Sequence, residues 1–269
     1  MKLLEYNLGE GTRAFSTYRQ GGVSRGLYAS FNANLFCGDD PAHVDANRTI
    51  LAQHLGLDKQ RLIIPHQTHG TAVRTVDRDF LDLTPEEQRR SLEGVDALVT
   101  DIKEVCLCVS TADCVPVVVY DPERKACACI HAGWRGMYRH IIPQAIQALD
   151  AYPTLQENHG RTKDAHPTRR AAIGPCIGLG SFEVGDEVYE AFELAGFDMS
   201  RIAARTGGPD SKWHIDLVEA AREECRRNGI SDECIQACGI DTFTHTDDFF
   251  SARKLGTQSG RILTGIVME

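Results

Sequence analysis

The chain has 269 residues, of which 42% are hydrophobic and 25% charged, the proportions of an ordinary soluble globular protein. Its formal net charge is −9, and because an acidic chain repels phosphate backbones, we expect no nucleic-acid partner. The opening residues, MKLLEYNLGE, lack the apolar core of a signal peptide, and no run approaches the roughly 20 apolar residues that cross a bilayer. We therefore expect a cytoplasmic protein that does not bind membranes.

Ten cysteines is a high count for a chain with no sign of secretion, and in a reducing compartment most should be free thiols. Cys106 and Cys108 alternate in one stretch, and Cys127 and Cys129 in another, which places each pair on one face of a strand. Free cysteine is among the most buried residue types, so we interpret these four as core residues. The absence of any CxxC argues against a zinc ribbon or a thioredoxin-like centre.

The first predicted helix follows a loop over residues 21–34, GGVSRGLYASFNAN, which is too long to be a simple turn. Asp40 is a good N-cap, Pro41 suits the first helical position, and Gly56 ends the apolar stripe. Arg48 shares the apolar face of this helix. A charge at such a position is paired, lines a polar pocket, or extends its head to water.

Apolar, β-rich runs dominate the middle of the chain. The expected strands are residues 61–64, 95–101, 105–113, 115–122, 125–131, 170–173 and 262–267. The expected helices are residues 135–149, with a break or kink at Pro143, residues 186–194 and residues 215–228. The polar residues 156–170 indicate a mobile connection. This mixture, without strict βαβ alternation or a linker, predicts one α/β domain over residues 1–269, with mixed sheets covered by helices.

Three strand ends carry side chains that suit a metal. His69 follows a strand in PHQTHG, Cys114 joins two strands in STADC, and His131 ends a strand in HAGWRG. A thiolate and two imidazoles suit zinc, copper accepts the same ligand types, and three protein ligands leave a fourth position open for catalysis. Judged by spacing alone, a lone histidine at a strand end is more often a hydrogen-bonding loop residue, and a lone cysteine in an apolar strand is more often a core residue. His66 also competes with His69, because H-x-x-H can chelate.

Two neighbours of these residues suggest further roles. If a helix begins near Arg135, its free N–H groups and the guanidinium face the metal region and could hold phosphate. Alternatively, Arg135 pairs with a carboxylate at a solvated helix end. Asp113, next to Cys114, could orient a ligand histidine, act as a base, or simply be a turn residue.

The motifs together resemble a known family. They are GGVS (21–24), the block from GDDP to NR (38–48), HQTHG, DALVTD, TADCVPV, HAGWRG, IGPCIG and FFSARKLGTQSGR. On these motifs the chain resembles, nearly end to end, the YfiH-type proteins. That family is also described as peptidoglycan editing factor, as multicopper polyphenol oxidase (laccase), and as a purine nucleoside phosphorylase family.

The resemblance implies a zinc site made by His69, Cys114 and His131, which favours His69 over His66. It implies phosphorolysis of adenosine, inosine and methylthioadenosine, with adenosine deamination as a further activity, so that the partners are a purine nucleoside and phosphate. It also implies a fold similar to the cytotoxic necrotizing factor deamidase domain. One departure is Asp241, which stands where members often carry cysteine. No heptad repeat demands assembly, so we expect a monomer.

We therefore predict Cys114, His131 and Asp113 as catalytic residues. The predicted substrate contacts are Arg48, Gln67 and Arg135, with the two arginines holding an anion.

Two rival functions stay open. A copper laccase commonly needs H-x-H pairs, and no two of the ten histidines are separated by one residue, which argues against a trinuclear copper centre. A cysteine hydrolase would use Cys114 as nucleophile and His131 as base on a peptidoglycan-related amide. A structural metal site ranks last, because only three ligands are evident.

Overall fold

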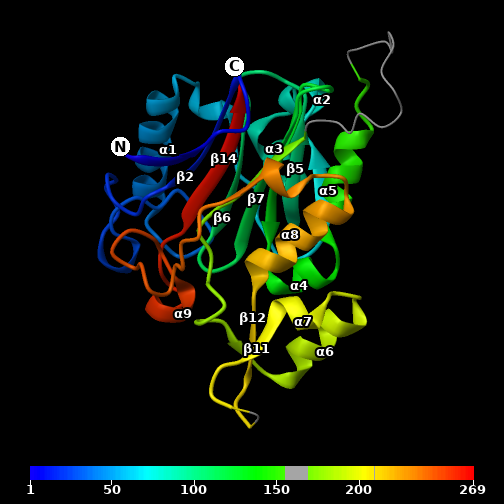
Figure 1. Cartoon of the computed structure of the whole chain (residues 1–269). Coiled ribbons are helices and arrows are strands. Elements are labelled where there is room, and N and C mark those ends of the chain that lie inside the picture. The colour runs from blue at the N-terminus through cyan, green and yellow to red at the C-terminus, as the bar shows by residue number, and fades with distance from the viewer. Residues whose placement is uncertain (155–168, 209) are drawn as a thin grey trace.

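The computed structural model describes residues 1–154, 169–208 and 210–269. Two β-sheets pack face to face at its centre, and helices cover their outer faces (Figure 1). The fold class is therefore α/β with mixed sheets, as the sequence predicts. The polar segment predicted as a mobile connection lies almost wholly outside the described residues. Among the helices that the structure describes, none is long and apolar enough to span a membrane.

The five-stranded sheet unites the two ends of the chain. Its order is β1 (Leu3–Tyr6), β2 (Thr12–Thr17), β14 (Ile262–Met268), β6 (Cys106–Thr111) and β3 (Leu62–Ile63). Strand β14 pairs antiparallel with both β2 and β6, whereas β3 runs parallel to β6 at the edge. The last strand is thus held in the middle of the sheet, beside a strand from the first residues of the chain (Figure 1).

The six-stranded sheet contains most of the strands predicted from the middle of the chain. Its order is β13 (Ile235–Ala237), β9 (Arg170–Ile173), β7 (Val115–Asp121), β8 (Ala126–Ala132), β5 (Val95–Thr100) and β4 (Ala72–Thr75). A small third sheet has the order β10 (Glu183–Val184), β12 (Trp213–Ile215) and β11 (Ala203–Arg205). Strands β6 and β7 are consecutive in the chain but belong to different sheets, so their short connection joins the two main sheets.

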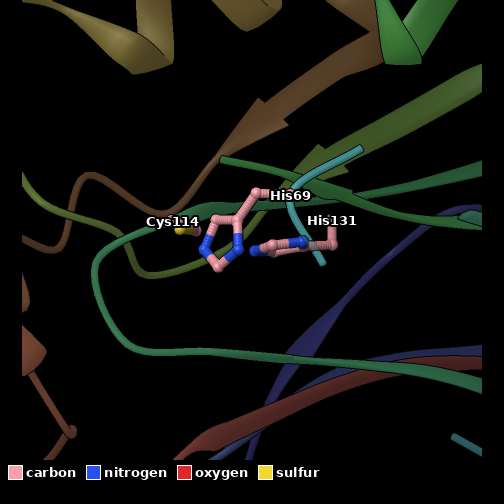
Figure 2. Close-up of side chains that lie close together, drawn as sticks. All are labelled: His69, Cys114 and His131. Carbon is pink, nitrogen blue, oxygen red and sulfur yellow. The ribbon is translucent and has the colours of Figure 1, made fainter. Parts of the chain in front are cut away.

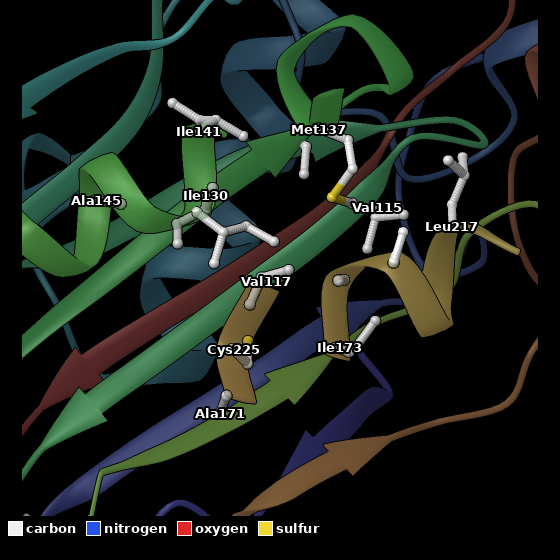
Figure 3. Packing of buried hydrophobic residues seen from close by; sticks show 14 of the residues in the cluster. Val115, Val117, Ile130, Met137, Ile141, Ala145, Ala171, Ile173, Leu217 and Cys225 are labelled. Atoms are coloured by element: carbon white, nitrogen blue, oxygen red, sulfur yellow. The ribbon is translucent and has the colours of Figure 1, made fainter. Parts of the chain in front are cut away.

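Alternating side chains explain how the layers pack. On β6, Leu107 and Val109 join the core between the two sheets, while Cys106 and Cys108 face the core beneath α1 (Pro41–Leu55). On β8, Cys127 and Cys129 point between the sheets. The opposite face of the six-stranded sheet packs against α5 (Ile141–Asp150) and α8 (Leu217–Arg227), as Figure 3 shows. The prediction that these cysteines are core residues is confirmed.

Helix boundaries follow the capping signals closely. The side chain of Asp40 accepts a hydrogen bond from the Ala42 N–H, and Gly56 ends α1 with a left-handed φ of 72°. The predicted helix over residues 186–194 is α6 (Asp186–Leu194), and that over 215–228 is α8. Shorter helices complete the chain: α2 (Arg78–Leu81), α3 (Pro85–Ser91), α7 (Met199–Ile202) and α9 (Ala252–Leu255).

The predicted helix over residues 135–149 is instead two helices, α4 (Trp134–Tyr138) and α5, with His140 between them at a φ of 62°. The predicted break occurs, and it lies one turn before Pro143. In a continuous helix, the proline ring would clash with the carbonyl of Arg139, one turn earlier. The chain breaks there instead, and Pro143 falls in the first turn of α5, where its missing N–H needs no partner.

Candidate metal centre

The structure brings His69, Cys114 and His131 together from three separate segments (Figure 2). Their nitrogen and sulfur ligand atoms all lie within 4.8 Å of one another. His69 comes from the loop between β3 and β4, Cys114 from the connection between β6 and β7, and His131 from β8. His69 has a φ of 62°, which is uncommon outside glycine and marks a tightly held loop.

One buried carboxylate holds both histidine segments in place. Asp96 on β5 has no exposed surface, and its Oδ1 lies 2.7 Å from Nδ1 of His131. It also accepts the backbone N–H groups of Thr68 at 3.3 Å, His69 at 3.0 Å and Gly70 at 2.7 Å. Because Asp96 occupies Nδ1, Nε2 is the nitrogen of His131 that remains available to a ligand.

The sequence analysis assigned no role to Asp96. The available signal is its position, since it is the only acidic residue inside the wholly buried strand β5. A buried carboxylate needs partners, but the strand pattern does not say which residues provide them.

The cluster shifts the pKa values of its own members in opposite directions. Burial alone would raise the pKa of the Cys114 thiol, but His131 and His69 lower it to about 6. Burial alone would lower the pKa of His131, but Cys114 and Asp96 raise it to about 9. Burial also opposes ionisation of Asp96, yet its hydrogen bonds from His131, Gly70 and Thr68 lower its pKa. Cys114 is therefore a thiolate at neutral pH, the form that binds metals.

The backbone of Gly133 passes close to the cluster. A Cβ on Gly133 would lie 2.8 Å from Cδ2 of His69 and 3.2 Å from Sγ of Cys114. Only a residue without a side chain fits there undisturbed. Two imidazoles and one thiolate form a set that zinc accepts, with a fourth position left for water or substrate. The residues present thus fit a catalytic zinc ion.

His66 lies outside the cluster. Its Nδ1 is 2.7 Å from Oε1 of Glu93, and its ring stacks on Phe36 at 3.9 Å between ring centroids. The choice between the two histidines of H-x-x-H is therefore made by the geometry in favour of His69.

Asp113 binds two segments from the C-terminal part of the chain. Its Oδ1 accepts the Thr242 hydroxyl at 2.7 Å, and its Oδ2 accepts the Arg253 N–H at 2.6 Å. Orientation of the His131 ring, one of the roles considered for Asp113, belongs to Asp96 instead. Like His69, Asp113 has a left-handed φ, here 86°.

The three predicted substrate contacts lie in different surroundings. The Gln67 amide binds Ser110 on β6, donating to its carbonyl at 2.9 Å and accepting its N–H at 2.8 Å. Arg135 is exposed in α4, with its guanidinium 4.2 Å above the Trp134 ring. Arg48 donates from Nε to the Ala33 carbonyl at 2.9 Å and lines a groove that none of the three candidate ligands lines. Their roles in substrate binding stay predictions.

Asp241 has a local structural role. Its carboxylate accepts the Ser181 hydroxyl at 2.5 Å and the Phe243 N–H at 3.0 Å. A Cβ on Gly178 would lie 3.0 Å from this carboxylate, so the two segments pack closely.

Mixed sheets with a His–Cys–His cluster at strand ends define an α/β protein with a candidate metal centre. The family described as "Multi-copper polyphenol oxidoreductase laccase" matches residues 13–269. The chain therefore belongs to this family, whose members include the YfiH-like proteins.

Two curated relatives and one solved structure are close matches along almost the whole chain. The chain is 44% identical to "Purine nucleoside phosphorylase" from Bacteroides thetaiotaomicron, over 95% of this chain and 91% of the relative. It is 40% identical to "Adenosine deaminase RL5" from an unknown prokaryotic organism, over 96% and 94%. The crystal structure of YlmD from Geobacillus stearothermophilus matches with a TM-score of 0.83 and 29% identity, over 97% of this chain and 93% of that one.

Proposed function

We propose that this protein is a zinc-dependent purine nucleoside phosphorylase that acts on adenosine, inosine and methylthioadenosine, with adenosine deaminase as a further activity. The observation that carries the proposal is the cluster of His69, Cys114 and His131, a set of three ligands that would leave a fourth position on a zinc ion open. The names of the two curated relatives support the two activities. A zinc ion with an open position supplies Lewis acidity that polarises a bound oxygen or base.

Zinc is favoured over copper by the number of ligands. The three-ligand cluster at His69 is the only such group among the described residues, and a trinuclear copper centre would need several more histidines. Copper accepts the same donor types, and the description of the family names it. Metal analysis combined with a phenol-oxidation assay on zinc-loaded protein separates the two functions.

The residues of the chain would mainly position the phosphate and stabilise the leaving purine. Phosphorolysis places phosphate beneath the anomeric carbon and stabilises the leaving purine, which are tasks of orientation and electrostatics. Arg135 lies two residues after Gly133, whose backbone passes beside the cluster, and we propose that its guanidinium supplies the positive charge that phosphate requires. Asp96 keeps the ring of His131 and the backbone of His69 fixed while substrate binds. Asp113, proposed as a base, accepts hydrogen bonds at both carboxylate oxygens.

The test compares the two histidines of the cluster with His66, which lies outside it. His69→Ala and His131→Ala should each lose bound zinc and inosine phosphorolysis together. His66→Ala, the matched control, should keep both, because His66 contacts Glu93 and Phe36 rather than the cluster. Retention of full phosphorolysis after loss of zinc would refute the metal-dependent function.

A cysteine hydrolase is the second candidate, favoured by one observation. The thiolate of Cys114 beside the charged imidazole of His131 is also the arrangement of a nucleophile and its base. Reaction with iodoacetamide distinguishes the two roles. A nucleophile that binds no metal reacts equally in zinc-loaded and zinc-free protein, whereas a zinc ligand is protected when zinc is present.

A further inference from the structure

A groove of about 520 Å³ lies between α1 and the α2–α3 segment, away from the cluster. Its lining includes the edge strand β3 and residues from α1, α2 and α3, but none of His69, Cys114 or His131. Cavities of ~300–1,000 Å³ are the size that holds small organic ligands. Of the three residues predicted to contact substrate, only Arg48 lines this space.

The groove contains a positive charge without a carboxylate partner. Arg48 lines it and is half-buried, and among the described residues no carboxylate lies within ion-pairing distance of its guanidinium. Burial lowers the pKa of Arg48 even though Cys108 and Asp45 act in the opposite direction, which reflects the cost of holding this charge away from water. An anion in the groove would offset that cost with charge-assisted hydrogen bonds.

The rim adds further positive charge. Lys59, Arg61 and Arg89 line the groove, against two acidic residues, Asp45 and Asp82. Lys59 and Asp45 neutralise each other in an ion pair at 2.6 Å. The groove is thus locally basic in a chain whose net charge is −9.

The remaining walls are apolar and partly exposed. Leu35 and Phe36 are 41% and 43% exposed, and both line the groove. Leu83 and Leu92 face them from the α2–α3 side of the same space. Large exposed side chains of this kind, beside unpaired charge, are typical of ligand sites rather than of inert surface.

We propose that this groove binds a small amphipathic organic anion, with an acidic group against Arg48 and an apolar or aromatic body against Phe36 and Leu83. The site is separate from the nucleoside site and stands whether or not the chain is a phosphorylase. The anion contact predicted for Arg48 from the sequence would then serve this second ligand.

The test uses 1-naphthoate as the probe, titrated calorimetrically into the zinc-loaded full chain. We expect saturable binding at one site, with the neutral analogue 1-naphthalenemethanol binding at least about tenfold more weakly, because the charge-assisted bonds are lost. Arg48→Gln and Phe36→Ala should each weaken naphthoate binding by a similar factor.

Matched controls distinguish the groove from general surface binding. Arg89→Gln should weaken binding severalfold, whereas Arg90→Gln should not, since Arg90 pairs with Glu86 and does not line the groove. Leu27→Ala should also leave binding unchanged, because Leu27 is 52% exposed but outside the groove. If Arg48→Gln fails to fold, Arg89→Gln, at an exposed position, carries the same test.

Three results would overturn the proposal. These are equal binding of the neutral analogue, an equal effect of Arg89→Gln and Arg90→Gln, and competition between inosine and naphthoate for one site. None of them depends on catalytic activity, so a failure of the proposed phosphorylase function would be recognised separately.

Discussion

Cys114 and Cys129 show how differently one residue type behaves at the end and in the middle of a strand. Cys129 lies wholly buried between the two sheets, and burial raises its pKa well above the ordinary thiol value. Cys114 lies where β6 leaves one sheet and β7 enters the other, beside two imidazoles that lower its pKa to about 6. The first is a packing residue, and the second is the residue that we propose as a metal ligand.

The two thiols differ in pKa because a strand end contacts loops that the middle of a strand does not. Inside the sheets, Cys129 packs in an apolar cluster and its sulfur donates to the Thr264 carbonyl at 3.3 Å, and no charged group among the described residues accompanies it. At the strand end, the loop between β3 and β4 brings His69 close to Cys114. Asp96 on β5 holds this loop through hydrogen bonds from its backbone. Burial therefore does not by itself determine reactivity, because nearby charges can outweigh it.

The largest contrast should come from removing each sulfur. Cys114→Ala should lower zinc affinity and inosine phosphorolysis by at least about 100-fold, since even outer partners of metal ligands contribute 10–100-fold. Cys129→Ala should keep zinc and activity but lower the free energy of unfolding by about 1 kcal/mol, through lost packing. Zinc content, initial rates and chemical denaturation measure the three quantities. Similar losses of activity in both variants would contradict the different roles assigned to Cys114 and Cys129.

Asp96→Asn tests the support behind the cluster. Asparagine keeps the size but cannot accept the hydrogen bonds of His131 and of three backbone N–H groups with a full charge. Zinc affinity should fall by about 10- to 100-fold. Asp101→Asn is the matched control, because Asp101 follows the same strand and is exposed. An unchanged zinc affinity in Asp96→Asn would contradict the positioning role.

The pH dependence of alkylation sharpens the comparison further. In zinc-free protein, the thiolate of Cys114 persists as the pH falls until about 6, because its pKa is lowered from the ordinary value. Its rate of reaction with iodoacetamide, followed by peptide mass spectrometry, should therefore fall with a midpoint near pH 6. The rate for a cysteine in an unstructured peptide should fall with a midpoint of ~8.5, and Cys129 should stay unreacted. A midpoint near 8.5 for Cys114 would contradict the assigned environment.

Gly133→Ala should produce the smallest effect. The added Cβ would lie 2.8 Å from Cδ2 of His69, which is closer than side chains approach one another, so the ring would have to shift. We expect about a three- to fivefold loss of zinc affinity, given that a displacement of ~1 Å can cost ~100-fold. Gly180→Ala, with nothing within 4 Å of its Cβ, is the control. Equal zinc affinities would show that the space beside the cluster is not needed.

Much of the fold follows from local signals in the sequence. The caps at Asp40 and Gly56 bound α1, and the apolar runs locate β5 to β8, because burial on both faces leaves no polar alternation. Strands β1 and β2 were not predicted, since short segments such as LLEY and TRAFST carry little periodicity. Their place beside β14 depends on pairing between the two ends of the chain, which no local pattern encodes.

The candidate site, like the fold, could be predicted only in part from the sequence. The ligand types at three strand ends suggested a cluster, but spacing alone did not separate His69 from His66. Only the folded loop, held through its backbone by Asp96, makes that choice. The groove around Arg48 also depends on tertiary packing, because the strand and helices that line it are separated in the chain.

X-ray absorption at the zinc edge tests the central claim most directly. On the purified, zinc-loaded protein, we predict one sulfur at about 2.3 Å and two imidazole nitrogens at about 2.0–2.1 Å, with one lighter oxygen or nitrogen neighbour. The sulfur signal should vanish in Cys114→Ala and remain in Cys129→Ala. A zinc environment without sulfur, or one that is the same in both variants, would contradict the assignment of His69, Cys114 and His131 as the metal centre.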